Sequence, residues 1–389
     1  MKILLLSSNT GGGHDMRARS FAQWAALSGV RGGVDVVRHQ ALEEGGALYV
    51  FGVWLYNFIQ RVRPDLHHIY FNVLEFVPFC DSAAVMPGRG VFQELVRREA
   101  PDVVLSTHDH LNHAFLEVAR AALPERPPLC GTYCGELAGG YGFSRRWVNP
   151  DADFFIGAVD ACVVEACRRG MPSEKAWTGG FMLNPDFWGE ATEADSRTAF
   201  LGGELNLDPE RFTLILGTGA NGANNHVALL ENLFRAGVCP QVVALCGGNE
   251  PARRAVEAWA QKHGSFPVRA LGYQARMRRV MASGDALFTR PGTGTTSEAI
   301  QCGLPVLFNG IGGVMPQEII TLRYCRRFFE TYLVRRAAAL PPLVAAWMDD
   351  PARLARVRAG VAAARPAGHP LSILEKLAAM SSTQPENRF

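Results

Sequence analysis

The chain has 389 residues, of which 48% are hydrophobic and 20% are charged, and its formal net charge is +2 at pH 7. These values exclude a disordered or fibrous chain, and the near-neutral charge gives no general attraction to nucleic acid. The length exceeds that of a typical single core, so we expect two domains.

The first predicted element is a short buried strand at residues 3–6, which leads directly into Gly11-Gly12-Gly13-His14. This apolar run is too short for the core of a signal peptide, and no later stretch reaches the length of a membrane span. Further strands are predicted at residues 34–37, 103–105, 129–132 and 154–156, with helical periodicity at residues 16–28, 90–99 and 112–123.

Residues 47–77 are unusually aromatic. Trp54, Tyr56 and Phe58 lie beside Arg61 and Arg63. Aromatic side chains at an acyl boundary and guanidinium groups at lipid head groups would suit a peripheral membrane contact. A pair of core helices in a large domain explains the composition equally well, and both interpretations remain open.

The second half repeats the pattern of the first. An apolar run at residues 212–216 leads into a glycine-rich turn at 217–222, strands are predicted at 242–245, 268–271, 286–289 and 306–308, and helices at 227–236, 251–263, 274–282 and 297–302. This alternation predicts two doubly wound parallel α/β sheets. We expect a first domain at residues 1–185, a linker at 186–206, a second domain at 207–342, helices at 343–380 and a tail without evident function at 381–389.

The stretch at residues 289–299 is typical of a phosphate-binding turn. Gly292 and Gly294 let the backbone approach an anion, and the N–H groups at a helix start carry partial positive charge. Glu298 cannot favour a phosphate, but it can accept hydrogen bonds from ribose hydroxyls. A tight strand-to-helix turn with a packing role alone is the alternative.

The nine cysteines contain no Cys-x-x-Cys pair, which favours a reduced cytoplasmic chain over a disulfide framework. Cys130 and Cys134 lie near His108 and His110 in the sequence, but their spacing does not fit the common structural zinc sites.

Three blocks of the sequence resemble one family of enzymes. They are Ser8-Asn9-Thr10-Gly11-Gly12-Gly13-His14; Leu271-Gly272-Tyr273 with Met277, Met281 and Asp285; and residues 290–299 followed by Gly303-Leu304-Pro305, Asn309 and Pro316-Gln317-Glu318. Over most of the chain, their order and spacing resemble the UDP-sugar glycosyltransferases of the monogalactosyldiacylglycerol synthase and processive diacylglycerol glucosyltransferase family, which is related to MurG. The resemblance implies an α/β GT-B fold, with two Rossmann-like doubly wound domains facing a central cleft.

The resemblance implies that the C-terminal domain binds a UDP-sugar. Glu298 would bind the ribose hydroxyls, and the diphosphate would be held by Gly292, Thr293, Gly294 and Thr295, with Gly217 and Gly219 facing it from below. Gln317 and Glu318 would lie at the sugar hydroxyls, and the backbone near Tyr273 would meet the uracil. Arg290 occupies the position of a family Lys and would supply part of the charge, whereas Thr293 departs from a family Pro.

The N-terminal domain would bind the acceptor and supply the base. Transfer to a hydroxyl needs a proton acceptor, and imidazole titrates near neutral pH. From the residues alone, His14 could be a helix cap or a packing residue. The resemblance favours His14 as the base or as a contact of the diphosphate, and it implies that Gly12, Gly13, Trp54 and Tyr56 lie at the acceptor.

The chain departs from the family pattern on the acceptor side. His108 and Asp109 follow a strand whose end carries a His in the family; they would bind the acceptor or reinforce the base, or else cap the next helix. Glu136 stands where the family usually has an Asp, and no corresponding His follows. Glu136 would therefore orient the base or act as the base.

These features predict an inverting glycosyltransferase that moves a hexose from a UDP-sugar to a hydroxyl of a lipid or other hydrophobic acceptor, at the cytoplasmic face of the membrane. Asp151-Ala152-Asp153 has the spelling of a metal-binding Asp-x-Asp, but GT-B enzymes generally use helix N-termini and basic side chains, so no metal or other cofactor is expected. Two alternatives remain open: a soluble aglycone or saccharide as acceptor, and a UDP-sugar epimerase or binding protein on the same scaffold.

Overall fold

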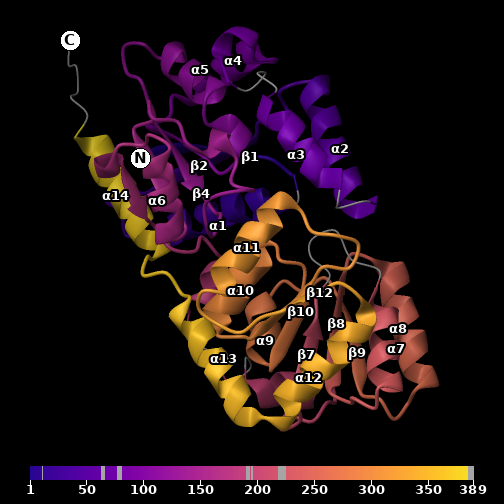
Figure 1. Ribbon diagram of the computed structural model, residues 1–389. Helices are drawn as coiled ribbons and strands as arrows, with labels where there is room; N and C mark the ends of the chain where they lie inside the picture. Colours follow the sequence, from indigo (N-terminus) through magenta and orange to yellow (C-terminus); the bar gives the residue numbers. More distant parts are fainter. Residues whose placement is uncertain are drawn as a thin grey trace. The chain divides into compact units, whose positions relative to one another are not determined.

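The computed structural model describes residues 1–10, 12–62, 66–76, 81–189, 193, 196–217 and 225–383. Its contacts divide the chain into two compact units, each built around one sheet (Figure 1). Unit 1 comprises Met1–Pro185, Met315–Ile320 and Pro366–Phe389, and unit 2 comprises Asp186–Val314 and Thr321–Arg365. Two segments that we expected in the second domain and its following helices are therefore grouped with unit 1.

Unit 1 contains a six-stranded sheet in the order β2-β1-β3-β4-β5-β6, in which every neighbouring pair is parallel. The side chains from Ile3 to Leu6 are completely buried, as expected for a central parallel strand. The strands predicted in this half are confirmed, and β6 is an additional one. The strands are β1 (Lys2–Ser7), β2 (Asp35–Gln40), β3 (Val103–Ser106), β4 (Leu129–Cys134), β5 (Phe154–Gly157) and β6 (Ala176–Thr178).

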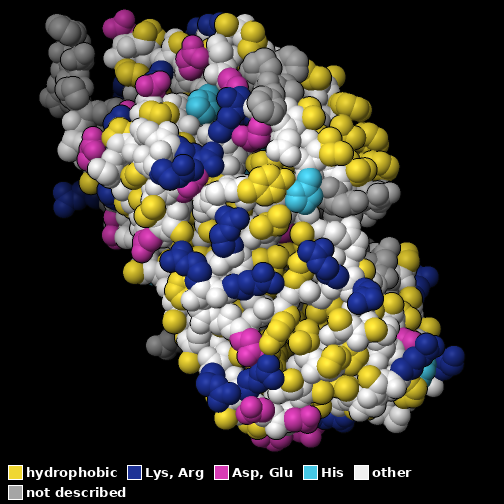
Figure 2. Space-filling model, viewed as in Figure 1, with side chains coloured by type: hydrophobic (Ala, Val, Ile, Leu, Met, Phe, Trp, Pro, Cys, Tyr) yellow, Lys and Arg dark blue, Asp and Glu magenta, His cyan; other side chains and the backbone are white. Residues whose placement is uncertain are grey.

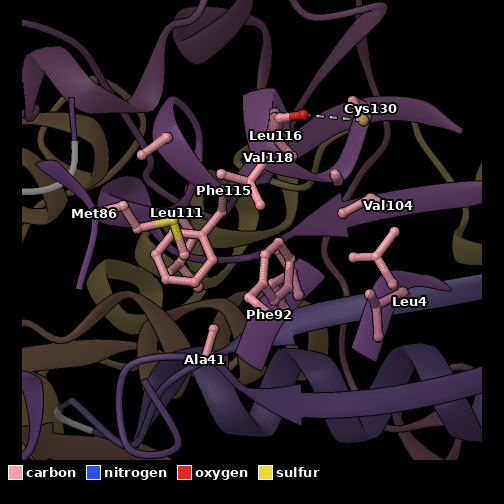
Figure 3. Close-up of a cluster of buried hydrophobic side chains, with 14 of the residues drawn as sticks. Leu4, Ala41, Met86, Phe92, Val104, Leu111, Phe115, Leu116, Val118 and Cys130 are labelled. Carbon is pink, nitrogen blue, oxygen red and sulfur yellow. Dashed lines mark hydrogen bonds between the residues drawn. The ribbon is translucent and has the colours of Figure 1, made fainter. Parts of the chain in front are cut away.

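A hydrophobic core covers one face of this sheet. Phe92 and Phe115, from two different helices, meet edge to face with ring centroids 5.0 Å apart, and Leu4 and Val104 of the sheet belong to the same cluster (Figure 3). The helices of unit 1 are α1 (Gly13–Leu27), α2 (Ala47–Val62), α3 (His67–Phe76), α4 (Arg89–Glu99), α5 (Ala114–Ala122), α6 (Asp160–Arg168) and α14 (Pro370–Ser382).

The C-terminal segment is fixed to unit 1 through α1 and the end of the first sheet. Trp24 on α1 donates its indole N–H to the Leu183 carbonyl at 2.8 Å, and its ring centroid is 5.1 Å from that of His369. Gly180 has φ +83°, and an ideal Cβ there would lie 2.4 Å from the Gly368 carbonyl oxygen. Only glycine allows this approach of the two backbones.

Unit 2 contains a second parallel six-stranded sheet, in the order β12-β11-β10-β7-β8-β9. The strands are β7 (Thr213–Leu216), β8 (Gln241–Gly247), β9 (Val268–Gly272), β10 (Ala286–Thr289), β11 (Val306–Asn309) and β12 (Leu333–Val334). The helices are α7 (His226–Arg235), α8 (Glu250–Lys262), α9 (Met277–Ala282), α10 (Thr293–Cys302), α12 (Leu340–Asp349) and α13 (Pro351–Ala363); α11 (Pro316–Cys325) begins in unit 1 and ends in unit 2.

The described helices and cysteines bear on two further expectations, a membrane span and a disulfide framework. Among the described helices, none combines the length and apolar character that a membrane crossing requires. The cysteines in the described part of the chain are free thiols, and most of them are buried.

Candidate functional site

The carboxyl ends of β1 and β3 form the switch point of the first sheet. These strands are neighbours, but the next strand after β1 lies on one side of the pair and the next strand after β3 lies on the other. Open α/β sheets bind ligands in the crevice that forms where the strand order reverses. The segment after β1 carries His14, and the segment after β3 carries His108 and Asp109. The topology therefore brings these predicted site residues together.

His14 lies in the first turn of α1 and contacts the end of β3. Its Nδ1 is 2.6 Å from the Thr107 carbonyl oxygen, and its ring centroid is 4.3 Å from that of His108. Because a carbonyl only accepts hydrogen bonds, Nδ1 carries the proton and Nε2 keeps the lone pair. Burial, and then His108 and Arg17, lower the pKa of His14 well below 6.5. The ring is therefore neutral at physiological pH, and its Nε2 can accept a proton.

The position of His14 excludes one of the roles that the sequence left open, that of a helix cap. The N-cap of α1 is Gly12, with φ 78°, so His14 does not cap the helix. The left-handed backbone at Gly12 favours glycine, and it turns the chain from the β1 loop into α1. Gly13 is the first helical residue, and Gly11 lies outside the described residues.

Asp109 is held between two histidines. Its Oδ1 is 2.9 Å from His110 Nδ1 and 3.1 Å from His108 Nδ1. Burial would raise the pKa of Asp109, but His110 and His108 together hold it well below its usual range, so the carboxylate is ionised. His108 reaches the loop after β1, with its Nε2 2.8 Å from Thr10 Oγ1. The His108 Nδ1 is also 3.2 Å from the His110 backbone nitrogen, and this ring atom either donates to Asp109 when it carries a proton or accepts from the His110 N–H when it does not.

The same three side chains are the one potential metal-binding group in the described part of the chain. The candidate ligand atoms of His108, Asp109 and His110 lie within 4.8 Å of one another. Asp153, from the Asp-x-Asp sequence, is engaged elsewhere: its Oδ2 accepts from the Cys130 N–H at 2.7 Å and from Arg120 at 2.8 Å.

Glu136 follows β4, the strand next to β3, and its side chain is buried. Burial raises the pKa of Glu136 to about 7; Arg17 opposes the rise and Asp109 adds to it. Its Oε2 has no hydrogen-bond partner among the described residues. Glu136 is therefore partly protonated near neutral pH. Because the charge of Asp109 acts on Glu136, the structure brings these two predicted acids into one region.

Arg17 is a residue of this region that the sequence analysis missed. It lies one turn after His14 on α1, and its Nη2 donates to the Gly135 carbonyl at 3.0 Å. An ideal Cβ at Gly135 would lie 2.1 Å from the Arg17 guanidinium, so glycine makes room for it. The positive charge acts on both His14 and Glu136. The spacing of three residues from His14 on one helix face was the available signal.

Gln317 and Glu318, expected at the donor sugar, lie in the part of α11 that belongs to unit 1. Gln317 Nε2 donates to the Tyr56 hydroxyl at 2.8 Å. Glu318 is buried, and its carboxylate accepts from the Met315 N–H at 2.8 Å, as in a capping box. Glu318 thus stabilises the start of α11, while Gln317 is next to Tyr56, a residue expected at the acceptor.

The aromatic stretch contains both a core-facing side and an exposed side. Tyr49 and Val53 of α2 are buried in the core, whereas Phe51, Trp54 and Phe58 are each about half exposed. The three exposed rings stack along the helix, with centroids 5.8 and 5.3 Å apart. Figure 2 shows hydrophobic side chains gathered over α2 and α3. The side chain of Arg61, and Arg63 altogether, lie outside the described residues.

In unit 2, the switch point lies between β7 and β10. These strands are neighbours, and the sheet continues from them in opposite directions. Gly217 follows β7, and an ideal Cβ there would lie 3.0 Å from Thr289 Oγ1 at the end of β10. Arg290 follows β10 directly and donates to the Ile311 carbonyl at 3.4 Å. Gly219 lies outside the described residues.

The predicted start of the helix after β10 was wrong by four residues. α10 begins at Thr293, with Gly292 as its N-cap, and not at Ser297. The weak helix propensity of Thr and Gly hid this first turn from the sequence pattern. The N–H groups of Gly294 and Thr295 therefore lie in the first turn, where a helix offers them no intrahelical acceptor. A helix start at the switch point is a site that favours anions.

Glu298 lies in the second turn of α10. Burial alone raises the pKa of Glu298 to about 7. No charged group of the described residues contributes to this shift, and a partly buried carboxylate in such a setting suits hydrogen-bond donors such as ribose hydroxyls. Tyr273, expected beside the uracil, follows β9 at the edge of the sheet, and its side chain is 78% exposed.

Comparisons with known proteins agree with this architecture. No protein-family model matches the chain. It is 23% identical over 368 residues, 94% of this chain and 89% of the other, to a processive diacylglycerol beta-glucosyltransferase of Staphylococcus saprophyticus. It is 24% identical to a probable chloroplastic monogalactosyldiacylglycerol synthase 2 of Oryza sativa, over 83% of this chain and 68% of the other.

Solved structures show the same fold at lower identity. MurG of Acinetobacter baumannii matches 97% of this chain and 99% of its own, with a TM-score of 0.58 and 11% identity. Anabaena HepE in complex with UDP matches 99% of this chain and 100% of its own, with a TM-score of 0.56 and 14% identity. The chain thus has the GT-B fold, with two parallel α/β sheets, and shares this fold with MurG; in sequence it is similar to the diacylglycerol glycosyltransferases.

Proposed function

We propose that the protein is an inverting glycosyltransferase that moves a hexose from a UDP-sugar to a hydroxyl of a lipid or other hydrophobic acceptor. One observation carries this proposal: His14 and Asp109 lie at the switch point of the first sheet, and Arg290 and the α10 N-terminus lie at that of the second. The curated relatives, which are named for diacylglycerol, support a lipid acceptor.

Unit 2 binds the nucleotide in this proposal. The diphosphate lies at the N-terminus of α10, near Gly292 to Thr295, and Glu298 accepts from the ribose hydroxyls. When the sugar leaves, negative charge develops on UDP. The helix N-terminus and Arg290 offset this charge, so that no metal ion is needed. Gly217 keeps the backbone after β7 close to Thr289 at the same switch point.

Unit 1 supplies the base. The acceptor oxygen attacks C1 of the hexose, the bond from C1 to the UDP oxygen breaks, and the acceptor proton passes to His14 Nε2. The Thr107 carbonyl fixes the required tautomer, because it accepts from Nδ1. Asp109 stabilises the cationic ring that forms, since its charge raises the pKa of His14. One displacement step inverts the configuration at C1.

The apolar side of α2 brings the protein to its acceptor. Phe51, Trp54 and Phe58 form a stacked, exposed stripe that suits the acyl boundary of a bilayer. We propose a peripheral contact with the cytoplasmic face of the membrane through this stripe, where a hydrophobic acceptor is presented.

Transfer from labelled UDP-glucose and UDP-galactose to vesicles that contain diacylglycerol tests the proposal. Label is expected in the lipid extract, and Trp54→Ser should reduce both flotation with vesicles and transfer. The control is Val164→Ser, which alters an exposed apolar residue elsewhere in unit 1. A buried residue such as Ile373 would not be a suitable control. Label that appears only in a soluble glycoside, or as a free epimer, would contradict the lipid acceptor.

A further inference from the structure

Unit 1 holds the short segment Met315–Ile320 at two places. Pro316 packs so closely on the loop after β4 that an ideal Cβ at Gly142 would lie 2.1 Å from the Pro316 carbonyl oxygen. The second place is α2, where the Tyr56 hydroxyl accepts from Gln317 Nε2 at 2.8 Å. The orientation of the Gln317 amide therefore depends on the position of α2.

Tyr56 is itself fixed by the neighbouring helix α3. Its ring centroid is 4.6 Å from that of His67 and 6.1 Å from that of Tyr70. Burial, and then Glu318, raise the pKa of Tyr56, so that its hydroxyl stays neutral at physiological pH. The contact with Gln317 is therefore a neutral hydrogen bond whose geometry follows the α2–α3 pair.

The exposed aromatic stripe lies on the other side of the same helix. Trp54 and Phe58 are each two positions from Tyr56, a rotation of about 200° in an α-helix. Their rings are stacked 5.3 Å apart and are about half exposed. One helix thus carries the apolar stripe on one side and the partner of Gln317 on the other.

We propose that Tyr56 is a positioning residue that links contact of α2 with a lipid surface to recognition of the donor sugar by Gln317. This inference rests on the proposed function, in which Gln317 contacts a sugar hydroxyl. Seating the stripe in a lipid surface restricts the motion of α2, and Tyr56 then holds Gln317 in one orientation, so that less freedom is lost when the sugar binds. The linkage is reciprocal: donor binding also strengthens lipid binding.

The test measures the affinity for UDP-glucose with and without vesicles of phosphatidylcholine and phosphatidylglycerol. These vesicles lack diacylglycerol, so transfer does not consume the donor. Vesicles are expected to tighten UDP-glucose binding to the unmodified protein about two- to tenfold, the range that one neutral hydrogen bond supports. Tyr56→Phe keeps the ring and removes the hydroxyl, and it should abolish the effect. Flotation verifies that this variant still reaches the vesicles.

Two controls separate positioning from a general structural role. Tyr70→Phe removes a hydroxyl from the same helix pair, where it donates to the Gly52 carbonyl at 3.2 Å, and it should keep the vesicle effect. UDP lacks the sugar, so vesicles should leave its affinity unchanged. In a Gln317→Ala background, Tyr56→Phe should have no further effect on UDP-glucose affinity, since both changes remove one interaction.

The outcomes distinguish the inference from the function on which it rests. If the unmodified protein binds neither UDP nor UDP-glucose, the proposed function fails, and the inference fails with it. The other case is that the unmodified protein binds both ligands and the vesicles. The donor site then stands, and the linkage is overturned by either of two results: vesicles do not tighten UDP-glucose binding to the unmodified protein, or they still tighten it in Tyr56→Phe.

Discussion

Replacing Glu298 with Gln tests whether this carboxylate binds the nucleotide. Burial raises the pKa of Glu298 to about 7, and hydroxyl groups donate more strongly to an ionised carboxylate than to its neutral form. The carboxyl group must therefore lose its proton when the ribose binds, and donor affinity should rise with pH. Between pH 6 and pH 8 the ionised fraction of such a group grows about tenfold, and the apparent affinity follows this fraction.

Calorimetric titration with UDP-glucose at pH 6, 7 and 8 measures the effect. UDP-glucose is preferable to UDP, because a terminal phosphate titrates near pH 6. At pH 8, Glu298→Gln should weaken binding by about 10- to 100-fold, the range for a hydrogen bond to a charged group, and its affinity should not vary with pH.

The matched control is Glu257→Gln, which removes a carboxylate of unit 2 that pairs with Arg253 on α8. It should bind UDP-glucose as the unmodified protein does at each pH. Flat affinity of the unmodified protein between pH 6 and pH 8, or unchanged binding by Glu298→Gln, would refute the reasoning.

Further predictions concern the base, the packing and the metal. His14→Ala should lower kcat about 10²- to 10⁴-fold with unchanged UDP-glucose affinity, as rates and calorimetry can show. Because the base must be unprotonated, activity is lost as pH falls through its pKa. At saturating UDP-glucose, where the titration of Glu298 no longer limits donor binding, kcat should therefore fall only well below pH 6.5, whereas a fall near pH 7 that Glu136→Gln removes would make Glu136 the base. Gly142→Ala should destabilise the fold by about 1–3 kcal/mol in thermal denaturation, because φ is +96° and Pro316 leaves no room, while Gly264→Ala should not. Turnover should persist in EDTA, and loss of activity that Mg²⁺ restores would contradict the metal-free mechanism.

Several features of the fold and the site follow from local sequence patterns. The apolar runs predict the strands, because a buried parallel strand is apolar on both faces. The glycines at 12 and 292 mark positions where the chain turns from a strand into a helix, and both are N-caps in the structure. The start of α10 was misplaced because Thr and Gly are weak helix formers, and tertiary structure overrides their propensity.

Other features depend on contacts between distant segments and could not be predicted. Gln317 and Tyr56 are 261 residues apart, and no local pattern indicates their hydrogen bond. The raised pKa of Glu136 comes from burial, which the sequence around it does not reveal. The two sides of α2 also needed the structure, since its dense apolar positions fit a core helix and a lipid-facing helix equally well.

The anomeric configuration of the product tests the central claim most directly. The protein is incubated with UDP-glucose, in which the glucose is α-linked, and with vesicles that contain diacylglycerol, and the lipid product is examined by mass spectrometry and NMR. A single displacement with His14 as base predicts a β-linked glucosyl lipid. An α-linked product, or consumption of UDP-glucose without any glycolipid, would contradict the account.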